Sequence, residues 1–195
     1  MLTGFHAGTP CHMLLGEGLF LRDFDCDAAD NADDLRGLIA DAILDGTHTL
    51  GATRGGGSFS CTPMLRQLDA EAMRTASAPG MVNDGWQVRM TGTLLEVTPT
   101  NLAALLPGAR IRQKGRMTTL TVQTDLTEGD FLPRLCWIGD TPRGFVLIEL
   151  TCALNIAGAV LTFQEHSEGE LPFVFQAHRP GWEDGEAPFR ILFFE

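Results

Sequence analysis

Acidic residues gather in one stretch near the N-terminus, where Asp23, Asp25 and Asp27 alternate with other residues. This spacing follows the start of the calcium-binding loop of an EF-hand. The sixth position of that loop needs glycine and is Ala28, and the twelfth is Asp34 instead of the longer glutamate that chelates calcium through both oxygens. No helical pattern precedes the stretch, so the sequence favours a solvated acidic connector over a calcium site.

A glycine-rich segment, residues 51–58, follows a short predicted strand, as phosphate-binding loops do. It contains no lysine, and the residues after it have the pattern of a strand, not of a helix whose N-terminus binds phosphate. We therefore expect flexible backbone or close approach of another subunit at Arg54, Gly55 and Gly56.

The residues that carry most enzyme chemistry have no recognisable spacing in this chain. The five histidines share no metal-ligand spacing, and Ser58 lacks the closing glycine of a nucleophile elbow. Glu165 and Glu168 are available as an acid–base pair, but no cleft can be inferred around them. The sequence thus predicts a non-enzymatic chain with no catalytic residue, no metal and no cofactor.

The five cysteines are odd in number, scattered, and never spaced as C-x-x-C. This argues against a disulfide framework and against a zinc site, and it favours synthesis in a reducing compartment. The cysteines are Cys11, Cys26, Cys61, Cys136 and Cys152.

Basic residues alternate strictly at Arg110, Arg112, Lys114 and Arg116, which places four positive charges on one side of an extended segment. Two interpretations are open. The charges guard a solvated edge strand against unwanted pairing, or they dock onto acidic groups of a neighbouring copy, such as those in 23–34 or 183–186.

The composition is that of a soluble globular protein. The chain has 195 residues, 44% apolar and 20% charged, which suits a single domain over residues 1–195. The net charge of −11 argues against tight nucleic-acid binding, because phosphate contacts need clustered Lys and Arg. The N-terminus has no secretory-signal pattern.

The longest apolar run, residues 144–163, contains a single charge at Glu149. Such a run is long enough for a membrane helix. Asn155 and Gly158 interrupt it, however, and every second residue from Val146 to Leu154 lies on one wholly apolar face of a strand. The sequence favours a buried β-hairpin with its turn at 155–158.

Two helices are expected, at 31–46 and 98–106, each with a capping residue at its start and glycine or proline at its end. Most of the remaining pattern is of short strands. They are expected at 12–22, 47–53, 58–68, 86–97, 117–124, 135–138, 171–177 and 189–194. The sum is a β-rich α+β fold, an antiparallel β-sandwich or partial barrel with one flanking helix.

Three segments are expected to project from this body and to reach neighbouring copies. Residues 1–11 have no periodicity and form an extended arm, and residues 70–85, with Arg74 and Met81, form a long loop. The third is the basic segment around 110–116.

Several phrases resemble, in their order and spacing, the tail tube (major tail) proteins of long-tailed bacteriophages. The similarity runs from about Leu50 to the end of the chain. The phrases are LGATRGGGSF at 50–59, MLRQLD at 64–69, LLEVTPTNL at 94–102, WIG at 137–139, FQAH at 175–178 and PFRI at 188–191. Ala70-Glu71 departs from the family's Asp-Gly turn, and the acidic region with its helix is not part of the matching pattern.

This resemblance implies a structural subunit of hexameric rings that stack into a hollow tube, with inner strands joined into a ring-wide barrel. Its partners would be further copies of itself, a tape-measure protein in the lumen, and tail terminator and distal tail proteins at the ends. DNA would pass through the lumen without specific binding, and no membrane is involved. Such a protein is assembled in the cytoplasm of the host bacterium and resides in the virion tail.

The alternative from another class is a monomeric β-sandwich carbohydrate-binding module, which would present an aromatic platform to sugars. Trp182, in an acidic loop, is the tryptophan placed to stack on a ligand; Trp86 and Trp137 lie in predicted strands. A glycosidase ranks third, because its paired carboxylates have no definite position.

Overall fold

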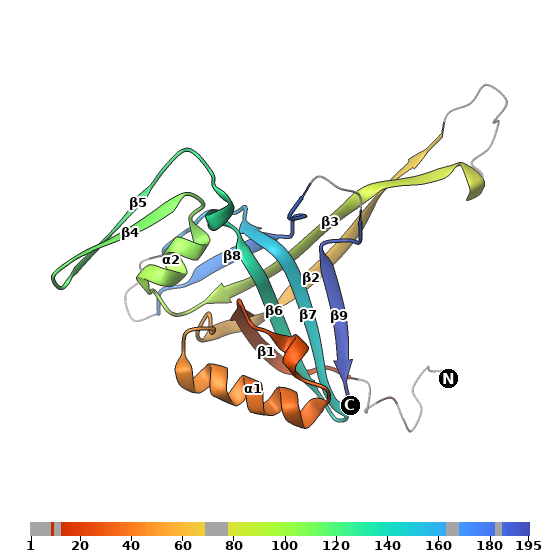
Figure 1. Ribbon diagram of the computed structural model, residues 1–195, viewed down its shortest axis with the longest axis horizontal. Helices are drawn as coiled ribbons and strands as arrows, with labels where there is room; N and C mark the ends of the chain where they lie inside the picture. Colours follow the sequence, from red (N-terminus) through yellow and green to blue (C-terminus); the bar gives the residue numbers. More distant parts are fainter. Residues whose placement is uncertain (1–8, 10–12, 69–77, 163–167, 182–184) are drawn as a thin grey trace.

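The computed structural model describes residues 9, 13–68, 78–162, 168–181 and 185–195. Over this part of the chain it contains nine β-strands and two α-helices, with every strand pair antiparallel (Figure 1). The predicted β-rich α+β fold is confirmed.

Four strands form the first sheet, sheet A, in the order β1-β6-β7-β9. They are β1 (Leu15–Arg22), β6 (Leu132–Thr141), β7 (Gly144–Asn155) and β9 (Phe189–Phe194). β6 and β7 are joined by a tight turn and pair along almost their whole length. Sheet A therefore has β1 and β9 as its two outer strands.

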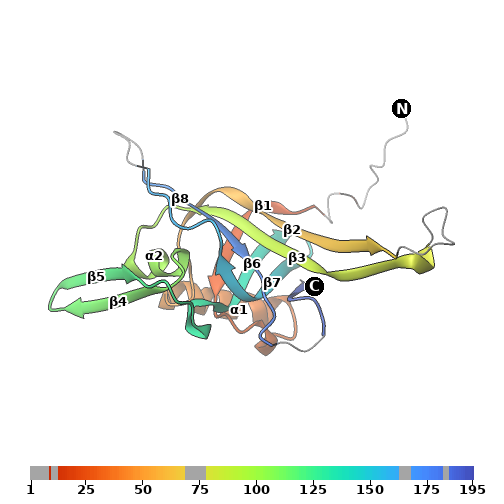
Figure 2. The same ribbon diagram turned by 90° about the horizontal axis from the view of Figure 1, so that it is seen from above.

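The second sheet, sheet B, has the order β8-β3-β2 and crosses sheet A at a steep angle (Figures 1 and 2). Its strands are β2 (Thr53–Gln67), β3 (Met81–Leu94) and β8 (Leu171–Gln176). The two sheets join where the end of β7 pairs with β8 at two positions. The outer halves of β2 and β3 continue beyond the body as a two-stranded ribbon.

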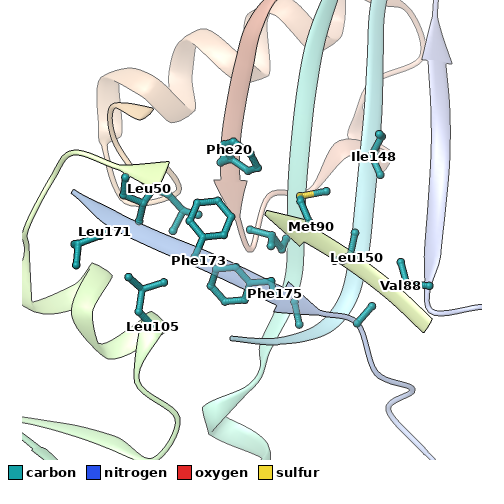
Figure 3. Close-up of a cluster of buried hydrophobic side chains, with 14 residues drawn as sticks. Phe20, Leu50, Val88, Met90, Leu105, Ile148, Leu150, Leu171, Phe173 and Phe175 are labelled. Carbon is teal, nitrogen blue, oxygen red and sulfur yellow. The ribbon is translucent and has the colours of Figure 1, made fainter. Parts of the chain in front are cut away.

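The main core lies between the two sheets, as Figure 3 shows. Phe20 from sheet A meets Phe173 from sheet B edge to face, with ring centroids 5.2 Å apart. Helix α2 (Pro99–Leu105), capped by Thr98 as predicted, closes one end of this core with the buried Leu105. Facing side chains from two sheets are the arrangement of a β-sandwich; a partial barrel is not confirmed.

Helix α1 (Ala32–Asp45) covers the other face of sheet A. Asn31 caps its N-terminus and Gly46 ends it in the left-handed conformation, as the sequence predicts. Leu35 and Ala42 are buried against the sheet. The molecule is thus a helix, sheet A and sheet B in three layers.

The remaining elements are a two-stranded hairpin and three short 3-10 turns. The hairpin pairs β4 (Ala109–Lys114) with β5 (Met117–Val122) and extends from the body beside α2 (Figures 1 and 2). The turns are η2 (Cys26–Ala28), η3 (Ala78–Gly80) and η4 (Glu128–Asp130).

The predicted hairpin within 144–163 is wrong. β7 continues to Asn155, residues 156–162 are not a strand, and the actual hairpin joins β6 to β7 through the turn before Gly144. Asn155 is fully buried and accepts a hydrogen bond from the amide of Val174, so a polar side chain ends the strand where a turn was expected. The apolar alternation also breaks at Cys152, whose φ is 46°.

Three further expectations need correction. Residues 47–52 form no strand and have only an isolated bridge at Thr49. The glycine-rich segment from Thr53 onward is part of β2, which is one strand of 15 residues. The predicted loop 70–85 ends earlier, because β3 begins at Met81; residues 70–77 lie outside the described part of the chain. Met13, within the predicted strand 12–22, is 52% exposed, and β1 begins only at Leu15. The expected arm 1–11 also falls almost entirely outside the described residues.

Candidate assembly surfaces

Sheet B has open strand edges on both sides. Among the described residues β2 pairs only with β3, so no strand is hydrogen-bonded to its other edge, although β1 lies near residues 55–59. β8 is covered by β7 only opposite Phe175 and Gln176, which leaves its first half open on that side. A long unpaired edge is a template for pairing with another chain.

The outward face of sheet B is rich in hydroxyl groups. Cross-strand register places Ser58 beside Thr91, and their hydroxyls are 2.7 Å apart. The same face carries Arg89, which donates to Gln176 at 3.3 Å, and it has no carboxylate along β2 from 58 to 62, β3 from 87 to 93 or β8. This face is polar and nearly neutral, although the chain as a whole is acidic.

The β2–β3 ribbon exposes large apolar side chains away from the core. Arg66 and Asp84 bridge its two strands through a paired contact of 2.8 and 3.1 Å. The exposed apolar residues are Met64, Leu65, Leu68, Met81 and Trp86, each between 40% and 57% exposed. Among the candidate interface residues Met81 is therefore on the surface, whereas Arg74 lies outside the described residues.

The glycine-rich start of β2 has an unusual backbone conformation, and its one charged residue, Arg54, is paired within the chain. Gly55 and Gly56 have φ values of 71° and 68°, beside a shift in the β2–β3 register. Arg54 donates to Glu168 at 2.7 Å and to Glu170 at 2.9 Å, so its charge is used within the chain. The space around both glycines is open, which leaves room for close approach of another chain.

The basic segment folds as the β4–β5 hairpin, which separates its residues into two faces. Register puts Arg110, Arg112 and Lys114 on one face, whereas Arg116 lies in the turn. Arg110 forms an ion pair with Asp130, a side chain only 3% exposed, at 2.5 Å. Hydrogen bonding to Arg110 lowers the pKa of Asp130 far below its usual value. The predicted row of four equivalent charges is thus wrong, because Asp130 neutralises Arg110 and Arg116 lies in the turn and not on the strand face.

A second exposed apolar area lies on the part of sheet A that sheet B does not cover. Leu14, Val146, Ile191 and Phe193 line a hollow of about 370 Å³ there, and Phe193 is 74% exposed. No motif or charge pattern in the sequence points to this area. The exposed aromatic in β9 was detectable only once the neighbours of the strand were known.

The acidic stretch is more ordered than a solvated connector. Asp25 and Asp27 pair with Arg134 at 2.7 and 3.4 Å, and Asp27 also pairs with Arg190 at 2.7 Å. Hydrogen bonding to Arg190 lowers the pKa of Asp27. These carboxylates are therefore not free to receive the basic hairpin of a neighbour.

A buried ion pair lies next to this stretch. Glu149, 5% exposed, accepts from Arg190 at 3.2 and 2.9 Å and from the thiol of Cys26 at 3.4 Å. Burial raises the pKa of Cys26 to about 11, so the thiol is neutral at pH 7. The described residues contain no group of three or more His, Cys, Asp or Glu side chains arranged to hold a metal ion.

The tryptophans do not form an aromatic platform over the described part of the chain. Trp137 is partly buried against the core and Trp86 lies on the ribbon, whereas Trp182 is outside the described residues. None of the helices in the described ranges is long and apolar enough to cross a membrane.

Comparison with known proteins gives no family: no protein-family model matches the chain, and no curated protein matches it either.

Proposed function

We propose that this chain is a structural, non-enzymatic subunit that forms hexameric rings, and that the rings stack into the tail tube of a bacteriophage. One observation carries the proposal: within the described part of the chain, no strand pairs with the outer edge of β2 or with the first half of β8. In a monomer such edges are an aggregation hazard, and joining them around a closed ring removes it.

The ring contact is heterologous. The β2 edge of one subunit pairs with the β8 side of the next, so every subunit uses two different edges. Around a ring such contacts close, and the strands of all the B sheets become one continuous barrel. The resemblance of the sequence to tail tube proteins supports the same arrangement.

The polar face of sheet B then lines the lumen, and α1 lies on the outside of the wall. A lumen lined by hydroxyl and amide groups offers few positive charges to phosphate, so DNA passes without adhering. Before ejection the same lumen holds a tape-measure protein. Tail terminator and distal tail proteins meet the two ends of the tube, and no cofactor, metal or membrane takes part.

A proline in β2 tests the edge pairing. Proline in an antiparallel sheet occupies positions whose N–H would face away from the ladder, as at Pro63 in β2. Because N–H directions alternate along a strand, Cys61 has its N–H on the same, outer side. Cys61→Pro thus removes a group offered to the neighbour while keeping the β2–β3 bonds.

Cys61→Ala is the matched control, because it keeps the N–H. We expect the alanine variant to assemble like the wild type, and the proline variant to remain a folded monomer by light scattering and thermal unfolding. Tubes of ordinary length from a folded proline variant would refute pairing through β2. A wild-type chain that stays monomeric and binds glycans would replace the proposal with the carbohydrate-binding alternative.

A further inference from the structure

The β4–β5 hairpin is a projecting element that its own chain leaves largely uncovered. Residues 111–119 are all exposed, with Met117 at 60% and Val122 at 55%. An isolated two-stranded hairpin is marginally stable in water, and stability requires further strands or a packed face. Within the described residues, α2 lies against its base, where Asp130 and Thr127 hold Arg110.

The two faces of the hairpin differ in chemistry. One carries Arg112 and Lys114 with Met117, which lies directly opposite Lys114. No ion pair in the described ranges uses Arg112, Lys114 or Arg116, whereas Arg110 at the base is held by Asp130. The hairpin thus has a fixed base and a free basic tip beside an apolar side chain.

Helix α1 carries the complementary surface. Asp34, Asp41 and Asp45 are separated by seven and four residues, which places them in one stripe along the helix. All three are exposed, and none takes part in an ion pair within the described residues. Leu44, 85% exposed, follows Asp41 by three residues and so lies beside the end of the stripe.

The C-terminal end of α1 carries negative charge, where the helix dipole favours positive charge. Its last turn has no basic residue, and Asp45 lies at the negative end of the helix dipole. A cation from outside the chain would relieve this repulsion. Asp41 and Asp45 are about 6 Å apart along the helix axis, and Arg112 and Lys114 are separated by about 6.7 Å along their strand.

We infer that the basic tip of the β4–β5 hairpin docks onto the acidic stripe of α1 in a neighbouring copy of this chain. Arg112 and Lys114 face Asp41 and Asp45, and Met117 packs against Leu44. The hairpin extends away from the body in both views (Figures 1 and 2), so it reaches outward to another molecule. The contact is heterologous and lies outside sheet B, and the inference rests on the proposed self-assembly.

Charge reversal tests the contact. The hairpin variant is Arg112→Glu with Lys114→Glu, and the helix variant is Asp41→Lys with Asp45→Lys. Each variant alone sets like charges against each other, and we expect the protein concentration needed for assembly to rise on the order of tenfold or more. Mixed in equal amounts, the two variants alternate with opposite charges at every contact, and assembly returns to the wild-type concentration.

Asp125→Lys with Asp140→Lys is the control, because it makes the same change in net charge as the helix variant at exposed sites on other segments. It should assemble at the wild-type concentration. If the two variants assemble normally while wild-type rings form, the inference is overturned and the proposed function stands. Loss of oligonucleotide binding with unchanged assembly would assign the basic tip to nucleic acid and also overturn it. If no variant and no wild-type chain self-associates, both proposals fail.

Discussion

The ion pair between Glu149 and Arg190 links the centre of sheet A to its β9 edge, beneath the acidic stretch. Both guanidinium contacts to the carboxylate are short, 3.2 and 2.9 Å, and Glu149 is 5% exposed. Arg190→Met removes the cation and leaves a carboxylate in the interior, with the thiols of Cys26 and Cys136 as its remaining side-chain partners. We expect this single change to be among the most destabilising in the chain.

The size of the effect follows from the burial of the two partners. Breaking a buried ion pair by removing one member costs about 3–5 kcal/mol. The side chain of Arg190 is 38% exposed, so water can partly replace it and the lower end, about 3 kcal/mol, applies. For a chain of this length that corresponds to a fall in Tm of about 6–12 °C.

Thermal unfolding of four proteins measures the effect: the wild type, Arg190→Met, the double variant Glu149→Leu with Arg190→Met, and the control Arg143→Met. Arg143 is exposed in the β6–β7 turn, so its loss should leave the Tm unchanged. The double variant should be more stable than Arg190→Met alone, because it removes the uncompensated charge. A double variant no more stable than the single one would refute the electrostatic reasoning and indicate lost packing instead.

Three other changes have definite outcomes. The pKa of Asp130 is far below its unfolded value, so its pair with Arg110 stabilises the fold fully above about pH 4 and less as the pH falls further. Urea unfolding should therefore give Asp130→Asn a lower free energy of unfolding than the wild type at pH 7, and the difference between the two should be smaller at pH 3. Asn155→Ala deletes two donated bonds and one accepted bond of a side chain 1% exposed, and should cost about 3 kcal/mol in the same assay; a loss below about 1 kcal/mol would show that the site readjusts. Phe193→Ser, at a side chain 74% exposed, should leave the Tm of the monomer unchanged, and a marked fall would mean that Phe193 packs within its own chain.

The helices could be predicted because their signals are local. Asn31, the single apolar stripe and Gly46 together define α1, and Thr98 with Pro99 defines the start of α2. The end of β7 could not be predicted in the same way. Asn155 and Gly158 look like a turn in sequence, but Asn155 is buried by contacts with residues 105 and 174, which are far from it in the chain.

The features of the candidate surfaces that depend on local sequence could likewise be predicted, and those that depend on distant contacts could not. Strict alternation revealed the basic face of the hairpin, since residues two apart on a strand share a face. It did not reveal that Asp130 neutralises Arg110, or that Asp27 is held by Arg134 and Arg190. Open strand edges depend on which strands pair, and the order β8-β3-β2 can be read only from the structure.

Electron micrographs of the purified full chain at increasing concentration show whether the edges of sheet B pair between copies. If they do, we expect hollow rings with sixfold symmetry that stack into tubes, and slow amide exchange along β2 once they form. A population of single molecules at every concentration, with β2 exchanging freely on its outer edge, would contradict this pairing.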